Sequence, residues 1–390
     1  MNKPITISDF RYVSFAQEVL FGRGELARLG EAVEFHGWKR FMVCTSHSVR
    51  ASGHAATLEA ILGVHVVAMF DHVRPHVQDV QVEEATALAT DNEAEVIIGM
   101  GGGSPIGMAK AVAYALEQAR ISRQTSVASS IAQPLIPVIA IPTTYAGSEM
   151  TAVYGITHSR ETPPRKITVS DPRIAPKLVV YDPELTLDLP PELTASSGIN
   201  ALAHCMEALY SVTRHPLSSA AAISGVRIIS GALLDCYEHA DNLVARTQML
   251  VGSHLAGLSL ASTSMGLHHG ICHVLGGSAN VPHGIANSIM LPHVIRFNAN
   301  AAADQLLPAA EALGIAVNGI RPDDAIESAA QKIFDLVGQM NLPQRLRDVG
   351  VSENDLRRLA EIGFQNRTVQ NNVKPIQDAA QIEALLRAAW

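Results

Sequence analysis

The stretch VIIGMGGGSPIGMAK, residues 96–110, decides how the first half of the chain is interpreted. A β-branched apolar run meets three consecutive glycines, then Ser104 and Pro105, and then a segment of helical periodicity. Ser104 suits the N-cap of a helix and Pro105 its first position. Glycine lets a backbone approach a ligand closely, and a helix N-terminus favours a pyrophosphate. The stretch predicts a nucleotide-binding strand–loop–helix unit. Because it is neither a GxGxxG fingerprint nor a P-loop, a tight structural turn is the alternative.

A second loop, IPTTYAGSEMT at residues 141–151, follows another apolar run and carries hydroxyls and a glycine. At the carboxyl end of a parallel strand, such a loop can bind the same ligand, although an ordinary polar turn has the same composition. The stretch Cys44–His47 ends an earlier run without an acidic residue. An acid there would favour NAD over NADP, so its absence leaves both NADH and NADPH open.

Strand-like and helix-like segments alternate in the first half, whereas the second half shows long helical patterns. This alternation predicts an α/β domain with a parallel sheet over residues 1–187, followed by an all-helical domain over residues 188–390. The boundary is placed in Asp182–Pro191, which contains three prolines. The predicted strands are Phe41–Cys44, His65–Met69, Val96–Ile98, Leu135–Ile141 and Val179–Tyr181, and the predicted helices are Glu25–Phe35, Val80–Thr90, Ile106–Leu116, Ala195–Val212, Ala220–Ala240 and Thr247–Leu260.

Composition narrows the class of protein. The 390 residues are 47% apolar with a net charge of −8, and no basic cluster stands out, so nucleic acid is not the expected partner. The four cysteines form no CxxC pair and are expected to be buried free thiols. The N-terminal residues show no signal-peptide pattern, and no apolar run is judged long enough for a membrane span. A cytoplasmic protein without a membrane partner is therefore expected, with an exposed loop at Thr125–Ala132.

Histidines recur in the second half. In SGINALAH, residues 197–204, Asn200 and His204 stand four apart where a helix is expected to open. In HHGICHVLGGSANVPH, residues 268–283, His269 and His273 are again four apart, and His283 follows a glycine-containing loop. Satisfied core histidines are one explanation. Three functional uses compete with it: metal ligands, a general acid, and a polar anchor for a carboxylate substrate.

Together these motifs resemble the iron-containing alcohol dehydrogenase superfamily, whose fold is dehydroquinate synthase-like. Within it the chain most resembles the maleylacetate reductases, which reduce maleylacetate to 3-oxoadipate with NADH or NADPH in bacterial degradation of aromatic compounds. The resemblance implies an NAD(P)H-dependent oxidoreductase, a small and anionic substrate, and a homodimer.

The resemblance also bears on metal. Metal-dependent members bind Fe or Zn through one Asp and three His, and the matching positions here are Asn200, His204, His269 and His283. An amide is a poor substitute for a carboxylate on a divalent cation, so a metal is not expected. Gly107 and Tyr145 also match the reductases. The stretch PHGIANSIMLPH, residues 282–293, instead resembles the alcohol dehydrogenases.

By resemblance, the nicotinamide is expected against the histidines of the helical half. His204, His269 and His283 are candidates for polarising the substrate or binding its carboxylates, together with Tyr145 and Asn200, and His273 is the candidate proton donor. The residues implied for the cofactor are Gly102, Gly103, Ser104 and Gly107 at the pyrophosphate, and Thr143, Thr144, Ser148 and Lys166 along the remaining groove.

Three other functions compete. A metal-dependent alcohol or aldehyde dehydrogenase keeps the fold and the cofactor but places Fe or Zn on the histidines. A lyase of the dehydroquinate synthase type uses NAD⁺ transiently and needs a metal. The third is a nucleotide-binding protein without catalysis. Asn200 argues against the first two, and the set of histidines argues against the third.

Overall fold

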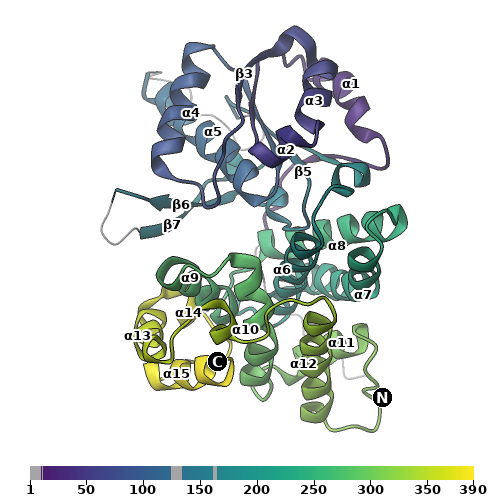
Figure 1. Cartoon of the computed structure of the whole chain (residues 1–390), viewed down its shortest axis with the longest axis vertical. Helices are drawn as coiled ribbons and strands as arrows, with labels where there is room; N and C mark the ends of the chain where they lie inside the picture. Colours follow the sequence, from purple (N-terminus) through teal and green to yellow (C-terminus); the bar gives the residue numbers. More distant parts are fainter. Residues whose placement is uncertain (1–9, 11, 124–133, 161–164) are drawn as a thin grey trace. The chain divides into compact units, whose positions relative to one another are not determined.

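A computed structural model describes residues 10, 12–123, 134–160 and 165–390 and divides the chain into two units (Figure 1). The α/β unit spans Ser14–Leu189, and the helical unit comprises Pro190–Trp390 with the N-terminal stretch up to Val13. The division lies close to the boundary expected after residue 187. The N-terminal stretch groups differently from the expectation because the rings of Phe10 and Tyr12 pack on His215, at 5.0 and 5.1 Å between centroids. The loop expected at Thr125–Ala132 lies entirely outside the described residues.

The α/β unit is built on a six-stranded sheet in which every pairing is parallel. The five predicted strands are confirmed, and one further strand at the sheet edge was not predicted. In spatial order the strands are β1 (Glu18–Phe21), β8 (Leu178–Tyr181), β5 (Val138–Pro142), β4 (Val96–Gly101), β2 (Phe41–Cys44) and β3 (Val66–Phe70).

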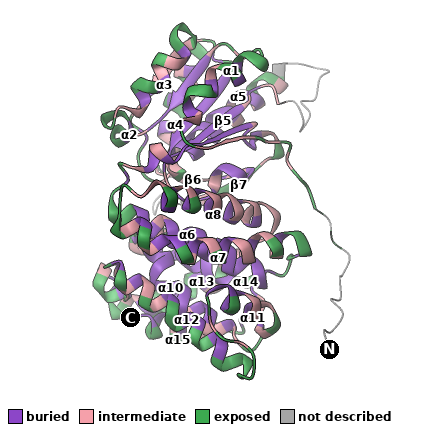
Figure 2. Ribbon diagram, turned by 90° about the vertical axis from the view of Figure 1, so that its right-hand side faces the viewer, coloured by how far each residue is buried: buried purple, intermediate pink, exposed green. Residues whose placement is uncertain are grey.

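Helices cover both faces of this sheet, because successive strand residues point to opposite sides. Phe41 and Val43 of β2 pack with helices α1 (Leu29–Phe35), α2 (His47–Ala51) and α3 (His54–Leu62). Met42 and Cys44 pack instead with α4 (Asp79–Asp91) and α5 (Gly103–Arg123). Figure 2 shows the strands buried between these helix layers. The predicted α/β class with a parallel sheet is confirmed.

The strand order fixes where a ligand can bind. From β2 the chain moves outward to β3, whereas β4 lies on the other side of β2 and leads on to β5. Connections therefore diverge at the carboxyl ends of β2 and β4, which is where open α/β sheets bind ligands. The strand β4 runs there almost directly into α5. An antiparallel pair of strands, β6 (Val153–His158) and β7 (Arg165–Ser170), was not predicted.

The helical unit contains no strand within 190–390, all of which the structure describes, and the predicted all-helical class is confirmed. Its first helix begins at Pro191, a favoured first position, so SGINALAH lies inside this helix and does not open it as expected. The helices are α6 (Pro191–Tyr210), α7 (Pro216–Glu238), α8 (Leu243–Ser262), α9 (Leu267–Ala279), α10 (His283–Asn298), α11 (Ala303–Ala312), α12 (Pro322–Gln339), α13 (Leu356–Gln365), α14 (Arg367–Gln370) and α15 (Ala379–Ala388).

One of the described helices, α7, is long and apolar enough to cross a membrane by length and composition. The expectation that no apolar run reaches that length was therefore wrong. The helix packs against α6 and α8, and a Cβ on its Gly225 would lie only 2.5 Å from the sulfur of Cys205. This close contact with α6 is typical of a helix in the core of a helical domain.

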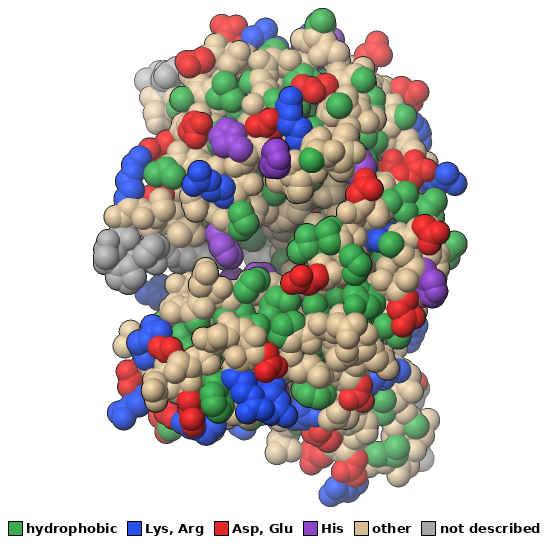
Figure 3. Space-filling model, in the orientation of Figure 1, with side chains coloured by type: hydrophobic (Ala, Val, Ile, Leu, Met, Phe, Trp, Pro, Cys, Tyr) green, Lys and Arg blue, Asp and Glu red, His purple; other side chains and the backbone are tan. Residues whose placement is uncertain are grey.

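Two other expectations from composition concern thiols and charge. All four cysteines are free and buried, as predicted. Figure 3 shows basic and acidic side chains interspersed over one face of the molecule.

Candidate active site

The glycine loop joins β4 to α5 and differs in detail from the prediction. The N–H of Ile106 donates to the carbonyl of Gly102 at 3.3 Å, so Gly102 is the N-cap and α5 begins at Gly103. Ser104 and Pro105 lie within the first turn and not at the N-cap and first position, because this hydrogen bond starts the helix earlier. Gly101 has a backbone φ of +140°, which residues other than glycine rarely adopt.

Close packing explains the other glycines of this loop. A Cβ on Gly99 would lie 2.8 Å from the Cα of Ile106, so the strand packs directly on the helix. A Cβ on Gly102 would lie 3.1 Å from the Cγ2 of Thr144. At Gly103, in contrast, the nearest atom would be the Oγ of Ser148 at 3.9 Å. Gly103 is therefore the residue of the three at which the start of α5 leaves the most room, and a helix N-terminus favours a phosphate.

The second loop lies beside the first, because the N–H of Thr143 donates to the carbonyl of Gly101 at 3.0 Å. The Oγ of Ser148 is buried without a hydrogen-bond partner, as expected of an atom that binds a ligand. Tyr145 is fully buried, and its hydroxyl donates to the Oγ1 of Thr186 at 3.3 Å. This position makes Tyr145 a support of the loop from within the core.

The structure thus brings together most of the predicted cofactor residues. Gly107 is buried in α5, where a Cβ would lie 3.0 Å from the Cγ2 of Val77, so its role here is packing. Lys166 lies in β7, and its side chain is outside the described part of the structure. The residues at the two adjoining loops are Gly102, Gly103, Ser104, Thr143, Thr144 and Ser148.

Lys110 is a buried residue of this region that the sequence did not single out. Its ammonium donates to the carbonyl of Ser148 at 2.6 Å, to the Oγ1 of Thr151 at 3.1 Å and to the carbonyl of Val153 at 3.1 Å. Burial lowers the pKa of Lys110 to about 7, and the charge of Glu149 opposes this shift. The side chain therefore holds the segment that follows the second loop. A single lysine in an apolar helix was the available signal.

The helical unit gathers the predicted histidines into one group, which we call the imidazole cluster: His204, His269, His273 and His283. The rings of His204 and His269 are stacked with their centroids 4.5 Å apart. His269 lies 6.0 Å from His283, which in turn is stacked with His273 at 5.6 Å. The cluster draws one ring from α6, two from α9 and one from the first residue of α10.

Several polar atoms in and beside the cluster lack partners. The Oδ1 of Asn200, the Nδ1 of His204 and the Nε2 of His269 are buried and make no hydrogen bond. Burial and the neighbouring imidazoles hold the pKa values of His204 and His269 well below the usual range. Both shifts favour the neutral form of each ring. Buried polar atoms without partners indicate a site for a polar ligand.

These residues do not fit a divalent metal. Asn200 supplies an amide where a carboxylate would be the ligand, and the rings of His204 and His269 face each other with planes 11° apart. Among the described residues, no three His, Cys, Asp or Glu side chains are arranged as a metal site. The nucleotide loops, in contrast, fit a pyrophosphate, because glycines, helix N–H groups and the free Ser148 hydroxyl adjoin there.

Three residues that contact the imidazole cluster or its helices were not singled out from the sequence: Glu207, His268 and Asn287. Glu207 is fully buried and lies 2.5 Å from the Nδ1 of His269. The Nε2 of His268 and the Oδ1 of Asn287 are 2.8 Å apart, and the amide of Asn287 donates to the carbonyl of His283 at 2.7 Å. These contacts tie α6, α9 and α10 together. Glu207 follows His204 by three residues, so its helical spacing was the available signal.

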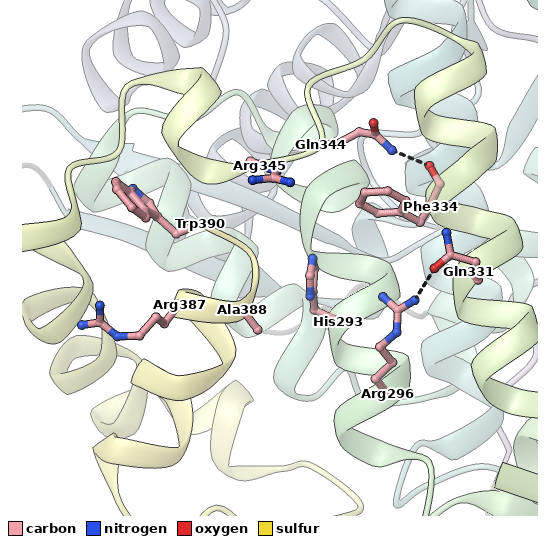
Figure 4. Close-up of a pocket in the computed structure, with 9 residues that line it drawn as sticks. All are labelled: His293, Arg296, Gln331, Phe334, Gln344, Arg345, Arg387, Ala388 and Trp390. Atoms are coloured by element: carbon pink, nitrogen blue, oxygen red, sulfur yellow. Dashed lines mark hydrogen bonds between the residues drawn. The ribbon is translucent and has the colours of Figure 1, made fainter. Parts of the chain in front are cut away.

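A separate cavity of about 350 Å³ in the helical unit contains none of the predicted residues (Figure 4). Arg296 and Arg387 line it, but their charges are neutralised by ion pairs with Glu327 at 2.8 Å and Glu353 at 2.6 Å. Burial and the nearby Arg296 lower the pKa of His293, another lining residue, to about 4. Two of the three arginines that line the cavity are therefore paired with carboxylates, and Arg345 is the third.

The family model for iron-containing alcohol dehydrogenase matches residues 16–183, and the model for the C-terminal part of the Fe-containing alcohol dehydrogenase family matches 194–390. The chain is 35% identical to a maleylacetate reductase of Pseudomonas knackmussii, over 98% of this chain and 97% of that protein. It is 31% identical to a 1,3-propanediol dehydrogenase of Klebsiella pneumoniae, over 95% and 96%.

A crystal structure of a maleylacetate reductase from Agrobacterium tumefaciens superposes with a TM-score of 0.83 at 31% identity, over 98% of this chain and 99% of that one. Both halves of the chain are thus matched, and the predicted superfamily and dehydroquinate synthase-like fold are confirmed. The chain is an oxidoreductase and belongs to the iron-containing alcohol dehydrogenase family.

Proposed function

We propose that this protein is an NAD(P)H-dependent reductase that converts maleylacetate to 3-oxoadipate, or acts on a similar unsaturated keto-dicarboxylate. The observation that carries the proposal is the neutral imidazole cluster with Asn200, not a carboxylate, beside it. Such a site can bind and polarise a carbonyl without a metal. Relatives named maleylacetate reductase, matched over nearly the whole chain, support the same substrate.

The proposed cofactor is NADH or NADPH, whose nicotinamide supplies a hydride when bound. The two adjoining loops would hold the pyrophosphate at the N-terminus of α5, with the hydroxyl of Ser148 as a further donor. Lys166 is the candidate cation for the remaining groove or for a substrate carboxylate. Gly107 and Tyr145 contribute indirectly, through packing of the helix and of the second loop.

The protein's part in the reaction follows from charge. Hydride addition to a C=C bond conjugated with a ketone places negative charge on the keto oxygen, and a positioned donor stabilises this charge. His204 and His283 are proposed as donors, with Asn200 and His269 also in contact with the substrate. His273, which is partly exposed, is proposed to deliver the proton to carbon. One substrate molecule, one NAD(P)H and one proton give the saturated product and NAD(P)⁺.

The direct test follows NADH and NADPH absorbance with the purified full chain. Maleylacetate and related conjugated keto-acids are compared with simple aldehydes. We expect stoichiometric oxidation of the nicotinamide only with the conjugated keto-acids. Turnover restricted to aldehydes would refute the proposal, and product formation without net NADH consumption would point to a lyase.

A metal-dependent alcohol or aldehyde dehydrogenase is the second candidate function. The stretch PHGIANSIMLPH, residues 282–293, and the similarity to a 1,3-propanediol dehydrogenase favour it. Metal analysis and exhaustive chelation separate the two candidates. We expect chelated protein to retain its activity, whereas loss of activity that Fe²⁺ or Zn²⁺ restores would establish the second candidate.

The remaining features complete the proposal. We propose a cytoplasmic homodimer that acts in the degradation of aromatic compounds. Light scattering on the purified protein tests the dimer, and a mass equal to one chain of 41.6 kDa would contradict it.

A further inference from the structure

Glu207 places a fully buried carboxylate between helix α6 and the start of α9. One oxygen accepts the backbone N–H groups of Gly266 at 3.0 Å and His268 at 2.9 Å. The other oxygen accepts the backbone N–H of His269 at 3.2 Å and lies 2.5 Å from the ring Nδ1 of the same residue. The carboxylate therefore caps the N-terminus of α9, by accepting its free N–H groups, and contacts one ring of the imidazole cluster.

These four contacts determine where the proton on His269 must be. Backbone N–H groups can only donate, and an ionised carboxylate can only accept. Burial raises the pKa of Glu207, whereas the three backbone N–H groups at the positive end of α9 lower it and favour the ionised form. The Nδ1 of His269 then carries the ring proton, and the Nε2 of the neutral ring has a lone pair. That Nε2 atom is buried and has no hydrogen-bond partner within the described protein.

We infer that Glu207 is a positioning residue that fixes His269 in the Nδ1–H tautomer and presents its Nε2 to the substrate as a hydrogen-bond acceptor. The ligand group at this point is consequently a donor, such as a hydroxyl or the O–H of an enol. A neutral His269 cannot donate to a keto oxygen, so that donor comes from another ring of the cluster. The inference rests on the proposed function for the substrate's identity, whereas the tautomer is a property of the free protein.

The stacking of the rings supports a fixed orientation. His269 is stacked on His204 at 4.5 Å and lies edge-on to His268 at 5.0 Å, so its plane is held from two sides. Carboxylates that hold one nitrogen of a catalytic or metal-binding histidine fix both its tautomer and its direction in other enzymes. Glu207 has the same relation to His269 here.

The first experiment reads the tautomer by ¹⁵N NMR of the full chain labelled on histidine, with His269 assigned by loss of its signals in His269→Asn. We expect the wild-type ring to be protonated at Nδ1. In Glu207→Gln the amide has one acceptor and one donor group, so its oxygen meets the backbone N–H groups and its NH₂ faces the ring. The ring proton is then expected at Nε2. A wild-type ring protonated at Nε2 overturns the inference, even if the variant does not fold.

The second experiment is a double-mutant cycle in the reductase assay. We expect Glu207→Gln to lower kcat at least tenfold with an unchanged KM for NADH, and to add little in the His269→Asn background, because one ring carries the effect. Independent, multiplicative losses would mean that Glu207 only caps α9. Glu117→Gln is the matched control, since this buried carboxylate accepts the N–H of Ile136 at 2.9 Å in the α/β unit. Failure of the proposed substrate would leave the NMR result unaffected.

Discussion

Replacing Gly103 by alanine separates nucleotide binding from stability. This residue is exposed in the first turn of α5, and a Cβ there would meet nothing closer than the Oγ of Ser148 at 3.9 Å. Alanine is preferred to glycine in a helix by up to about 1 kcal/mol, so the variant is expected to fold at least as well. The added methyl group would occupy the approach of a pyrophosphate, and overpacking of this kind costs about 1–3 kcal/mol, or roughly 5- to 150-fold in affinity.

The assay measures the Kd of NADH by titration calorimetry and the Tm by differential scanning calorimetry. Gly231→Ala is the matched control, because Gly231 lies in α7 with nothing within 4 Å of an added Cβ. We expect both variants to match or exceed the wild-type Tm, and Gly103→Ala alone to lose affinity. A folded Gly103→Ala protein with wild-type affinity for NADH would refute the placement of the pyrophosphate at α5.

Three further predictions follow from buried or clustered groups. The pKa of Lys110 is lowered from 10.5 to about 7, so the unfolded chain binds a proton there that the native chain lacks. The free energy of unfolding is expected to rise across that pH range by up to about 5 kcal/mol, and Lys110→Met to abolish this rise in urea titrations; an unchanged slope would contradict it. Gly198→Ala would bring a Cβ within 2.3 Å of the Cδ1 of Leu233, and a loss of about 1–3 kcal/mol in urea unfolding is expected. His273→Ala is expected to lower kcat by about 10²–10⁴-fold with the KM for NADH retained, and near-normal turnover would remove this histidine from the mechanism.

Local pattern was sufficient for much of the fold. The apolar runs at β2, β4 and β5 are fully buried strands of a parallel sheet, which is why they stand out in the sequence. The edge strand β1 was missed because its four residues begin with a glutamate, and β6 because it mixes glycine, threonine and histidine. The start of α5 depends on the backbone hydrogen bond from Ile106 to Gly102, which cannot be predicted from the residue types.

The candidate site was predictable to a similar extent. The spacing of four residues between histidines predicted a shared face, and the structure places their rings 4.5–6.0 Å from their neighbours. Glu207 was missed because its partner His269 lies 62 residues further along the chain. Lys110 was missed for the same reason, since its acceptors begin 38 residues away. The spacing of Glu207 from His204 and the single lysine in an apolar helix mark these residues, but not the distant partners that they meet through tertiary packing.

The complete burial of α6 from Gly198 to Tyr210 has a consequence for engineering. Most substitutions at these positions are expected to destabilise the protein, because buried side chains in a closely packed helix have little room to change. The opposite holds near the end of α9, where Gly277 is exposed and an added Cβ on it would meet only open space. Directed evolution toward new substrates is best begun there.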